Sequence, residues 1–139
     1  MTGDAEVMRT KQLKVLVVDD EPAICKAIVT YLERAGYEVL STQSGDTAIS
    51  IMQREHVDIL LVDLRIPDTR GDVVFESGAA HQPQLRQQTV FMTGDLSERG
   101  MDLVTWCKCP LLHKPFELSA MLAMVNSVAP ARDHDARTA

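Results

Sequence analysis

The sequence has few features of a secreted, membrane-spanning or nucleic-acid-binding protein. No apolar run approaches the roughly 18 residues of a membrane-spanning helix, and the N-terminal segment MTGDAEVMRTKQ lacks the apolar stretch of a signal peptide. The formal net charge is −6, and lysine and arginine do not gather on any periodic face. Such a chain is poorly suited to binding nucleic acid or an anionic membrane directly. We therefore expect a cytoplasmic chain whose partners are proteins or small molecules.

Cysteine is also scarce. Cys25, Cys107 and Cys109 are odd in number and lack the spacing of a disulfide framework, so we expect reduced thiols. Cys107-x-Cys109 alone would also suit metal or redox chemistry. No second cysteine pair or well-placed histidine accompanies it, which favours free thiols that are buried or partly exposed.

The length allows one compact domain but not two. The chain has 139 residues and a hydrophobic content of 45%, enough for one core. It shows no internal repeat and no low-complexity tract. We expect a folded domain over residues 13–129, with flexible extensions at 1–12 and 130–139 because both ends are polar.

Apolar segments alternate along the chain with segments of helical spacing. Residues 14–19, 57–63 and 88–95 are nearly continuous apolar runs rich in β-branched residues, which is typical of strands buried on both faces. Weaker strand signals occur at 37–42 and 111–113. Helices are predicted from Pro22 to a stop at Gly36, from a Ser44 cap onward, from Ser97 to 107, and over 117–128. The remaining segment, 71–88, contains valines, Gly78 and Pro83, so we expect a short or irregular helix there.

This alternation predicts the fold class and the place of a site. Five strand-helix units with short connections favour an α/β fold with a doubly wound parallel sheet, covered by helices on both faces. In the five-stranded order 2-1-3-4-5, ligands bind outside the carboxyl ends of strands 1 and 3. The functional residues should therefore follow the strands directly.

Polar residues do lie at the carboxyl ends of the predicted strands. These residues are Asp19 and Asp20 at the end of the first strand, Asp63 at the end of the third, Thr93 to Asp95 at the end of the fourth, and Lys114 next to the fifth. Two carboxylates about 4 Å apart repel by about 4 kcal/mol at an effective dielectric constant of about 20, so clustered acids need a shared proton or a cation. Oxygen ligands select a hard cation, and Mg²⁺ fits. With a lysine, a hydroxyl and a spare carboxylate nucleophile, such a site is equipped to bind a phosphoryl group.

Four segments, VLVVDDEP, ILLVDLRIPDTRG, VFMTGD and LLHKPF, together resemble the receiver domain of bacterial two-component response regulators. The resemblance covers about residues 14–128 and implies the flavodoxin-like receiver fold. It also implies that Asp63 accepts a phosphoryl group from a histidine kinase or a histidine phosphotransfer protein. Thr93 and Lys114 would then hold the phosphoryl oxygens, and the Lys114-Pro115 bond would be cis.

The resemblance also implies a metal site. Mg²⁺ would be held by Asp20, Asp63 and the main-chain carbonyl of Arg65, with Asp19 acting through water. Arg65 and Asp95 occupy places that flank the attacking water in relatives and tune the lifetime of the phosphoryl group. We expect the two side chains, which carry opposite charges, to pair across the site entrance.

The sequence departs from the family at Leu111, where relatives often have a tyrosine or phenylalanine whose position follows the threonine, here Thr93. The aromatic form of that switch is therefore in doubt. The face formed by 96–107, 111–113 and 117–128, through which relatives often signal or form homodimers, is expected to work differently here. FMTGD and LLHKPF are similar to receivers attached to hybrid histidine kinases, and the sequence does not decide between a stand-alone protein and a fragment of a larger one.

Other interpretations remain for individual residues and for the whole chain. Glu21 is interpreted as a helix cap, since a negative charge is favoured there. His113 should point away from Leu112, and Trp106 with methionines 101, 121 and 124 should belong to the core or a partner surface. A flavin carrier on the same topology would need a phosphate-binding loop after the first strand, but the acidic segment DDEPA stands there and would repel a phosphate. A phosphohydrolase with an aspartyl nucleophile would often have D-x-D after the first strand, and this sequence lacks that arrangement.

Overall fold

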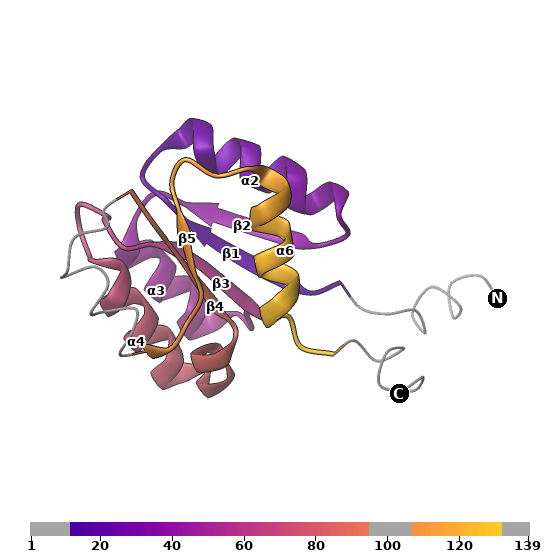
Figure 1. Ribbon diagram of the computed structural model, residues 1–139. Helices are drawn as coiled ribbons and strands as arrows, with labels where there is room; N and C mark the ends of the chain where they lie inside the picture. Colours follow the sequence, from indigo (N-terminus) through magenta and orange to yellow (C-terminus); the bar gives the residue numbers. More distant parts are fainter. Residues whose placement is uncertain (1–11, 95–106, 132–139) are drawn as a thin grey trace.

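The computed structural model describes residues 12–94 and 107–131. Their core is a five-stranded parallel sheet in the order β2-β1-β3-β4-β5, so the predicted strand order is confirmed (Figure 1). The strands are β1 Lys14–Val18, β2 Glu38–Thr42, β3 Ile59–Asp63, β4 Thr89–Thr93 and β5 Leu111–His113. The predicted helix over 97–107 lies almost entirely outside the described residues, as do most of the two predicted extensions.

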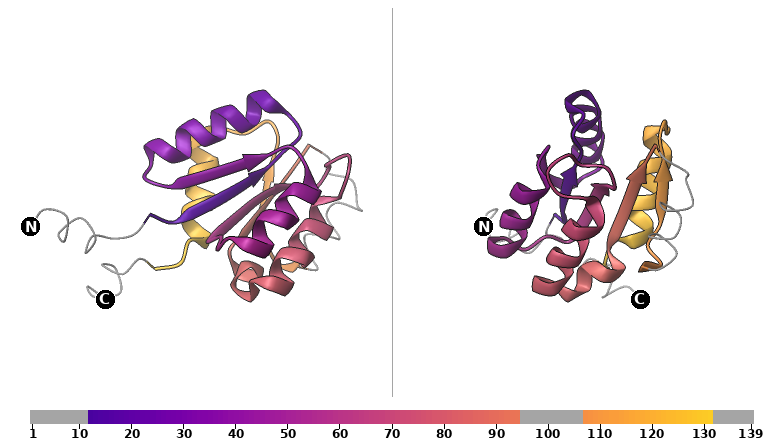
Figure 2. Two further views of the ribbon diagram at one scale, coloured as in Figure 1. Left: turned by 180° about the vertical axis from the view of Figure 1, so that it is seen from behind. Right: turned by 90° about the vertical axis from the view of Figure 1, so that its left-hand side faces the viewer.

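Helices cover both faces of the sheet (Figure 2). The helices are α2 Pro22–Arg34, α3 Gly45–Arg54, α4 Gly71–His81 and α6 Leu118–Val128, with a 3-10 turn, η1, at Pro83–Gln87. α2 and α6 pack on one face, and α3 and α4 on the other. None of these helices is long and apolar enough to cross a bilayer.

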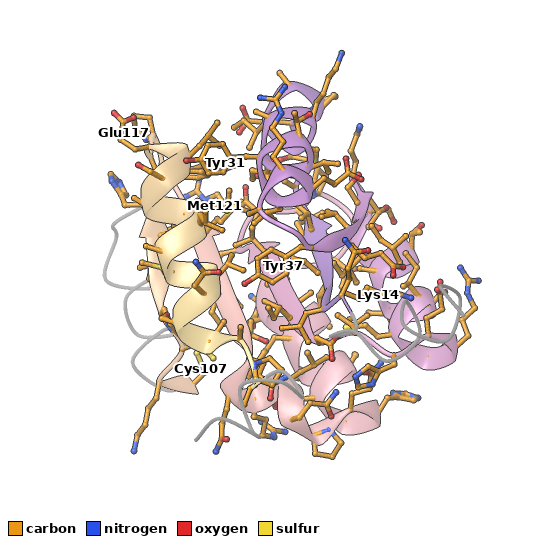
Figure 3. All side chains as sticks on the ribbon, turned by 90° about the vertical axis from the view of Figure 1, so that its right-hand side faces the viewer. Lys14, Tyr31, Tyr37, Cys107, Glu117 and Met121 are labelled. Carbon is orange, nitrogen blue, oxygen red and sulfur yellow. The ribbon has the colours of Figure 1, made fainter. Side chains whose placement is uncertain are left out.

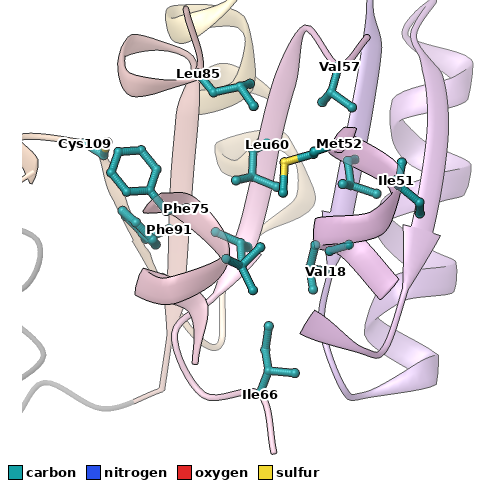
Figure 4. Close-up of a cluster of buried hydrophobic side chains, with 14 of the residues drawn as sticks. Val18, Ile51, Met52, Val57, Leu60, Ile66, Phe75, Leu85, Phe91 and Cys109 are labelled. Atoms are coloured by element: carbon teal, nitrogen blue, oxygen red, sulfur yellow. The ribbon is translucent and has the colours of Figure 1, made fainter. Parts of the chain in front are cut away.

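The alternation of side chains along β1 divides the buried residues into two cores. Val15 and Val17 face α2 and α6, in a core that also contains Tyr37 and Met121, both labelled in Figure 3. Leu16 and Val18 face α3 and α4, in the core shown in Figure 4. In this second core the rings of Phe75 and Phe91 meet edge to face, with centroids 5.3 Å apart. Burial on both faces explains why β1 reads as an uninterrupted apolar run.

The register of the sheet places the predicted site residues on one edge. Val18 is paired with Val62, and Thr93 with His113, so the carboxyl ends of β1, β3, β4 and β5 lie side by side. Asp19 is the first residue beyond β1, and its N–H donates to the carbonyl of Thr42 at 3.1 Å.

The weak helix expected over 71–88 is only partly as predicted. Residues 71–81 form a regular helix despite their valines and Gly78, and the irregularity begins at Pro83 with η1. Tertiary packing overrides the low propensity because Val74 and Phe75 are buried against the sheet. Gly78 lies where α4 meets α3, and a Cβ there would collide with the Met52 thioether.

The C-terminal end of α3 is closed by one side chain from beyond α4. Gln82 Nε2 donates to the carbonyls of Met52 and Glu55, both at 2.8 Å. Its Oε1 accepts the N–H of Val57 at 2.9 Å. This amide, which we call the Gln82 clamp, satisfies carbonyls that the helix end leaves without intrahelical partners.

Gly71 begins α4 against the main chain of the predicted phosphoacceptor. A Cβ at this position would overlap the carbonyl oxygen of Asp63 and lie 2.8 Å from Cα of Leu64. We expect Gly71→Ala to destabilise the fold by about 2 kcal/mol or more, because backbone cannot move aside as a side chain can. Gly78→Ala is the matched control and should cost less, since Met52 is flexible and alanine is the better helix former. Urea unfolding measures the free energy of unfolding of both variants. Equal losses of stability would contradict the close approach of Gly71 to the main chain of Asp63.

Candidate functional site

Lys114 lies at the centre of the acidic residues. Its Nζ is 2.6 Å from Asp63 Oδ2, 2.7 Å from Asp19 Oδ2 and 3.1 Å from Glu21 Oε1. Its N–H donates to the carbonyl of Thr93 at 2.8 Å, which ties β5 to the end of β4. The Lys114-Pro115 bond is cis, as predicted. Strand ends far apart in the sequence thus converge on one ammonium group.

The two innermost acids are held in the same way. Asp19 and Asp63 are buried, while Asp20 and Glu21 are exposed. Asp63 Oδ1 accepts the N–H of Arg65 at 2.8 Å, and Asp19 Oδ1 accepts the N–H of Glu21 at 2.9 Å. Each buried carboxylate therefore has one oxygen fixed by the main chain and the other facing Lys114.

Burial and charge act in opposite directions on the pKa values of this cluster. Burial alone would lower the pKa of Lys114, but hydrogen bonds and charge from Asp19 and Asp63 outweigh it and hold the pKa well above its usual range. Burial raises the pKa of Asp19, and the opposing effect of Lys114 does not cancel it. The ionised form of Asp19 is thus less favourable in the fold than in water.

We expect Asp19→Asn to stabilise the Mg²⁺-free protein at neutral pH by an amount of order 1 kcal/mol. An acid whose folded pKa is raised destabilises the fold above that pKa and has no effect below its unfolded pKa. Asparagine keeps an acceptor for the Glu21 N–H, and Lys114 keeps Asp63. The gain should shrink as the pH falls into the ordinary aspartate range. Unfolding measured in EDTA from neutral to acidic pH checks this, with the exposed Asp20→Asn as control, and a loss of stability at neutral pH would contradict it.

The fifth strand places its side chains as its alternation predicts. Leu112 is buried and His113 is exposed, so the histidine points away from the core. Leu111 is half-buried and packs against the core on the α3 and α4 side. Thr93 is buried at the end of β4, on the edge of the sheet that holds Asp63. Asp95 lies outside the described residues, so its pairing with Arg65 stays a prediction.

The interpretation of Glu21 as a helix cap is wrong in part. Glu21 occupies the N-cap position of α2, but its side chain makes no capping hydrogen bond. Its carboxylate contacts Lys114 instead, because an ammonium group is a stronger partner than a neutral N–H and Pro22 offers none. By contrast, Ser44 caps α3 as predicted and accepts the N–H of Thr47 at 3.1 Å.

The cysteines take no part in a metal centre within the described residues. None of the three forms a disulfide there, and the one group of three or more candidate ligands is acidic. The thiol of Cys25 donates to the carbonyl of Asp19 at 3.2 Å, and burial raises its pKa to about 11. Burial also raises the pKa of Cys109 to about 12. Such thiols are poorly reactive, because the thiolate is the nucleophile.

The acidic cluster fits a hard divalent cation. One carboxylate oxygen from each of Asp19, Asp20, Glu21 and Asp63 lies within 4.8 Å of the others. Lys114 supplies a single positive charge to these four acids, which leaves an excess of negative charge. Oxygen donors carrying such an excess match the ligand preferences of Mg²⁺ and Ca²⁺.

The convergence of these acids, a threonine and a lysine on a 2-1-3-4-5 sheet matches a known family. A model of the response regulator receiver domain matches residues 15–126 of the chain. The chain belongs to this family. Receiver domains act in two-component signalling, so this chain is a signalling domain.

Relatives of this receiver domain occur in regulators and in a sensor kinase. A probable transcriptional regulator, ycf27, of Porphyridium aerugineum is 41% identical over 83% of this chain and 47% of its own length. The autoinducer 1 sensor kinase/phosphatase LuxN of Vibrio campbellii is 29% identical over 77% of this chain and 12% of its own length. The chain thus spans half or less of these relatives.

Solved structures share the fold of the receiver domain. The chemotaxis protein CheY4 of Vibrio cholerae has 25% identity and a TM-score of 0.76, over 85% of this chain and 99% of its own. A CheY-like receiver domain of Methanospirillum hungatei has 22% identity and a TM-score of 0.78, over 84% and 93% of the two chains.

Proposed function

We propose that this receiver domain accepts a phosphoryl group on Asp63 from a phosphohistidine of a histidine kinase or histidine phosphotransfer protein. The observation that carries the proposal is the environment of the Asp63 carboxylate. One of its oxygens is fixed by the N–H of Arg65, and the other faces the Lys114 ammonium at 2.6 Å. A response regulator of Burkholderia pseudomallei with a TM-score of 0.73 contains a phosphorylated aspartic acid and a calcium ion in its crystal structure.

In the proposed transfer, an oxygen of Asp63 forms a bond to phosphorus as the bond from phosphorus to the donor imidazole breaks. The imidazole leaves with that electron pair. The Lys114 ammonium, which contacts Asp63 in the structure, would move to contact a phosphoryl oxygen. The Thr93 hydroxyl would donate a hydrogen bond to another phosphoryl oxygen. Both donors would lower the barrier by stabilising the negative charge that develops on the phosphoryl oxygens.

We infer that Mg²⁺ is the cofactor, held by Asp20, Asp63 and the main-chain carbonyl of Arg65, with Asp19 acting through water. When bound, it would neutralise charge on the phosphoryl oxygens and so allow an anionic donor to approach the acids. The residues fit this ion by the oxygen-only donor set and the excess negative charge.

A groove beside Lys114 supports a protein as the phosphodonor. The groove holds about 510 Å³ and is lined mainly by apolar side chains of α2 and of the segment after β5, including Ile24, Phe116 and Leu118. Glu21 and Lys114 also line it. An apolar groove that leads to the proposed acceptor suits an amphipathic helix carrying the phosphohistidine.

We infer that phosphorylation shifts an existing equilibrium between two surface arrangements. The proposed output face comprises residues 96–107, β5 and α6, and would bind a downstream protein or a second copy of the chain. Leu111 lies on this face in place of the aromatic switch residue of relatives. The proposed change of surface arrangement would therefore depend on movement of the main chain and on the packing of aliphatic side chains. We propose a cytoplasmic location, with self-phosphorylation and autodephosphorylation as the activities.

The proposed function is tested by intact mass spectrometry after incubation with Mg²⁺ and acetyl phosphate. We expect one labile phosphoryl adduct that does not form in EDTA. A protein that stays unmodified with acetyl phosphate and with a phosphorylated phosphotransfer protein would contradict the proposal. Release of many phosphates per protein molecule would indicate a phosphohydrolase, and a yellow purified protein would indicate a flavin carrier.

A further inference from the structure

The loop between β3 and α4 is fastened to the N-terminus of α3 by Asp68. Its carboxylate accepts hydrogen bonds from Ser44 Oγ at 2.7 Å, from the N–H of Gly45 at 3.0 Å and from the N–H of Asp46 at 3.1 Å. A carboxylate at this place is favoured by the free N–H groups and by the helix dipole. Consistently, the N–H of Gly45 and its neighbours lower the pKa of Asp68 to about 2.

A further hydrogen bond between the loop and α3 has its donor in the loop and its acceptor in the helix. The hydroxyl of Thr69 donates to a carboxylate oxygen of Asp46, in the first turn of α3. Gly45 is buried beneath the loop, and a Cβ there would lie 2.7 Å from the carbonyl oxygen of Thr69. The loop and the helix are therefore in direct contact, with no room for a side chain between their main chains.

The other end of the loop is bound to the proposed phosphoacceptor. The N–H of Arg65 donates to Asp63 Oδ1 at 2.8 Å, and the N–H of Gly71 donates to the carbonyl of Leu64 at 3.1 Å. The proposed metal ligand, the carbonyl of Arg65, belongs to this loop. Its place is thus set on one side by Asp63 and on the other by the attachment of Asp68 to α3.

We propose that Asp68 is a positioning residue for the Mg²⁺ site: by binding the N-terminus of α3, it holds the loop that presents the Arg65 carbonyl beside Asp63. The inference rests on the proposed function, since it concerns the same site. Asp68 contacts no reacting group and acts through the main chain. Holding the loop in the folded protein removes an ordering cost that the metal would otherwise have to meet on binding.

The test is Mg²⁺ titration by isothermal calorimetry on the full chain. We expect Asp68→Ala to weaken Mg²⁺ binding about 10-fold, as loss of a residue supporting a metal ligand typically does. Asp68→Asn keeps an oxygen acceptor for the N–H groups of α3 and should recover part of the loss. Ser44→Ala removes one of the same bonds and should give a smaller loss. A purely structural role would lower the melting temperature and leave the affinity of the folded protein unchanged.

The matched control is Asp72→Ala, which removes the same charge from the first turn of α4, where Asp72 pairs with Arg70 but not with α3. We expect its Mg²⁺ affinity to stay within about twofold of the wild type, because Asp72 pairs with Arg70, so its loss leaves the attachment of the loop to α3 intact. Equal losses in Asp68→Ala and Asp72→Ala would show that charge alone matters and would overturn the inference. So would an unchanged affinity in Asp68→Ala and Asp68→Asn. If the wild type binds Mg²⁺ and is phosphorylated, such results contradict this inference alone; if it does neither, the proposed function fails with it.

Discussion

Asp63→Asn is expected to abolish the phosphoryl adduct completely. The amide is nearly the same size as the carboxylate, so the fold should persist and its oxygen can still accept the N–H of Arg65. What is lost is the anionic nucleophile, because a neutral amide is too weak a nucleophile to accept the phosphoryl group. Intact mass after incubation with Mg²⁺ and acetyl phosphate should show only the unmodified chain.

The control for this variant is Asp58→Asn, the same change just before β3, at the opposite end of the strand. Asp58 accepts the N–H of Lys14 at 2.7 Å and makes no contact with the site. We expect this variant to be phosphorylated at the wild-type rate. An adduct of undiminished yield in Asp63→Asn would move the phosphoacceptor to another residue.

Lys114→Met is expected to have the second-largest effect, on both phosphorylation and stability. Removing a hydrogen-bond donor that stabilises a developing charge typically slows a reaction about 100-fold or more. The change also leaves Asp19, which is fully buried, and Asp63 without their shared cation. Breaking a buried pair in this way costs about 3 kcal/mol. The rate of phosphorylation is measured from reactions quenched at successive times, and the free energy of unfolding is measured with urea.

The pH dependence of Lys114→Met gives a second check on its mechanism. Without the ammonium, the pKa of Asp19 rises further in the fold, so the destabilisation should be largest at neutral pH and should diminish as acid protonates the carboxyl. Lys26→Met, an exposed lysine on α2, serves as control and should change neither property. A loss of stability in Lys114→Met that is the same at neutral and acidic pH would show that packing, not charge, is responsible.

The strands and the site were predictable because their signals are local. A strand buried on both faces must be apolar at nearly every position, and a polar residue directly after it must lie at the sheet edge. The apolar run before Asp63 thus predicts both the strand and the place of the acid. α4 is harder to predict, because its stability comes from Phe75 and Val74 packing on the sheet and not from its own propensities.

The contacts made by Glu21 and Asp68 were not predictable for a different reason. The neighbours of Glu21 indicated a helix cap, and those of Asp68 indicated no particular role. Their partners come from elsewhere in the chain: Lys114 is 93 residues from Glu21, and Ser44 is 24 residues from Asp68. Only the register of the sheet and the packing of the loop bring these groups together, and a local pattern contains neither.

The Gln82 clamp has a consequence for how the domain opens. One amide group holds the last carbonyls of α3 and also the N–H of Val57, which leads into β3. Fraying of the helix end would therefore release a main-chain N–H outside the helix. In hydrogen exchange, Val57 should open together with the last turn of α3 and exchange faster in Gln82→Ala, so that these two segments form one cooperative unit.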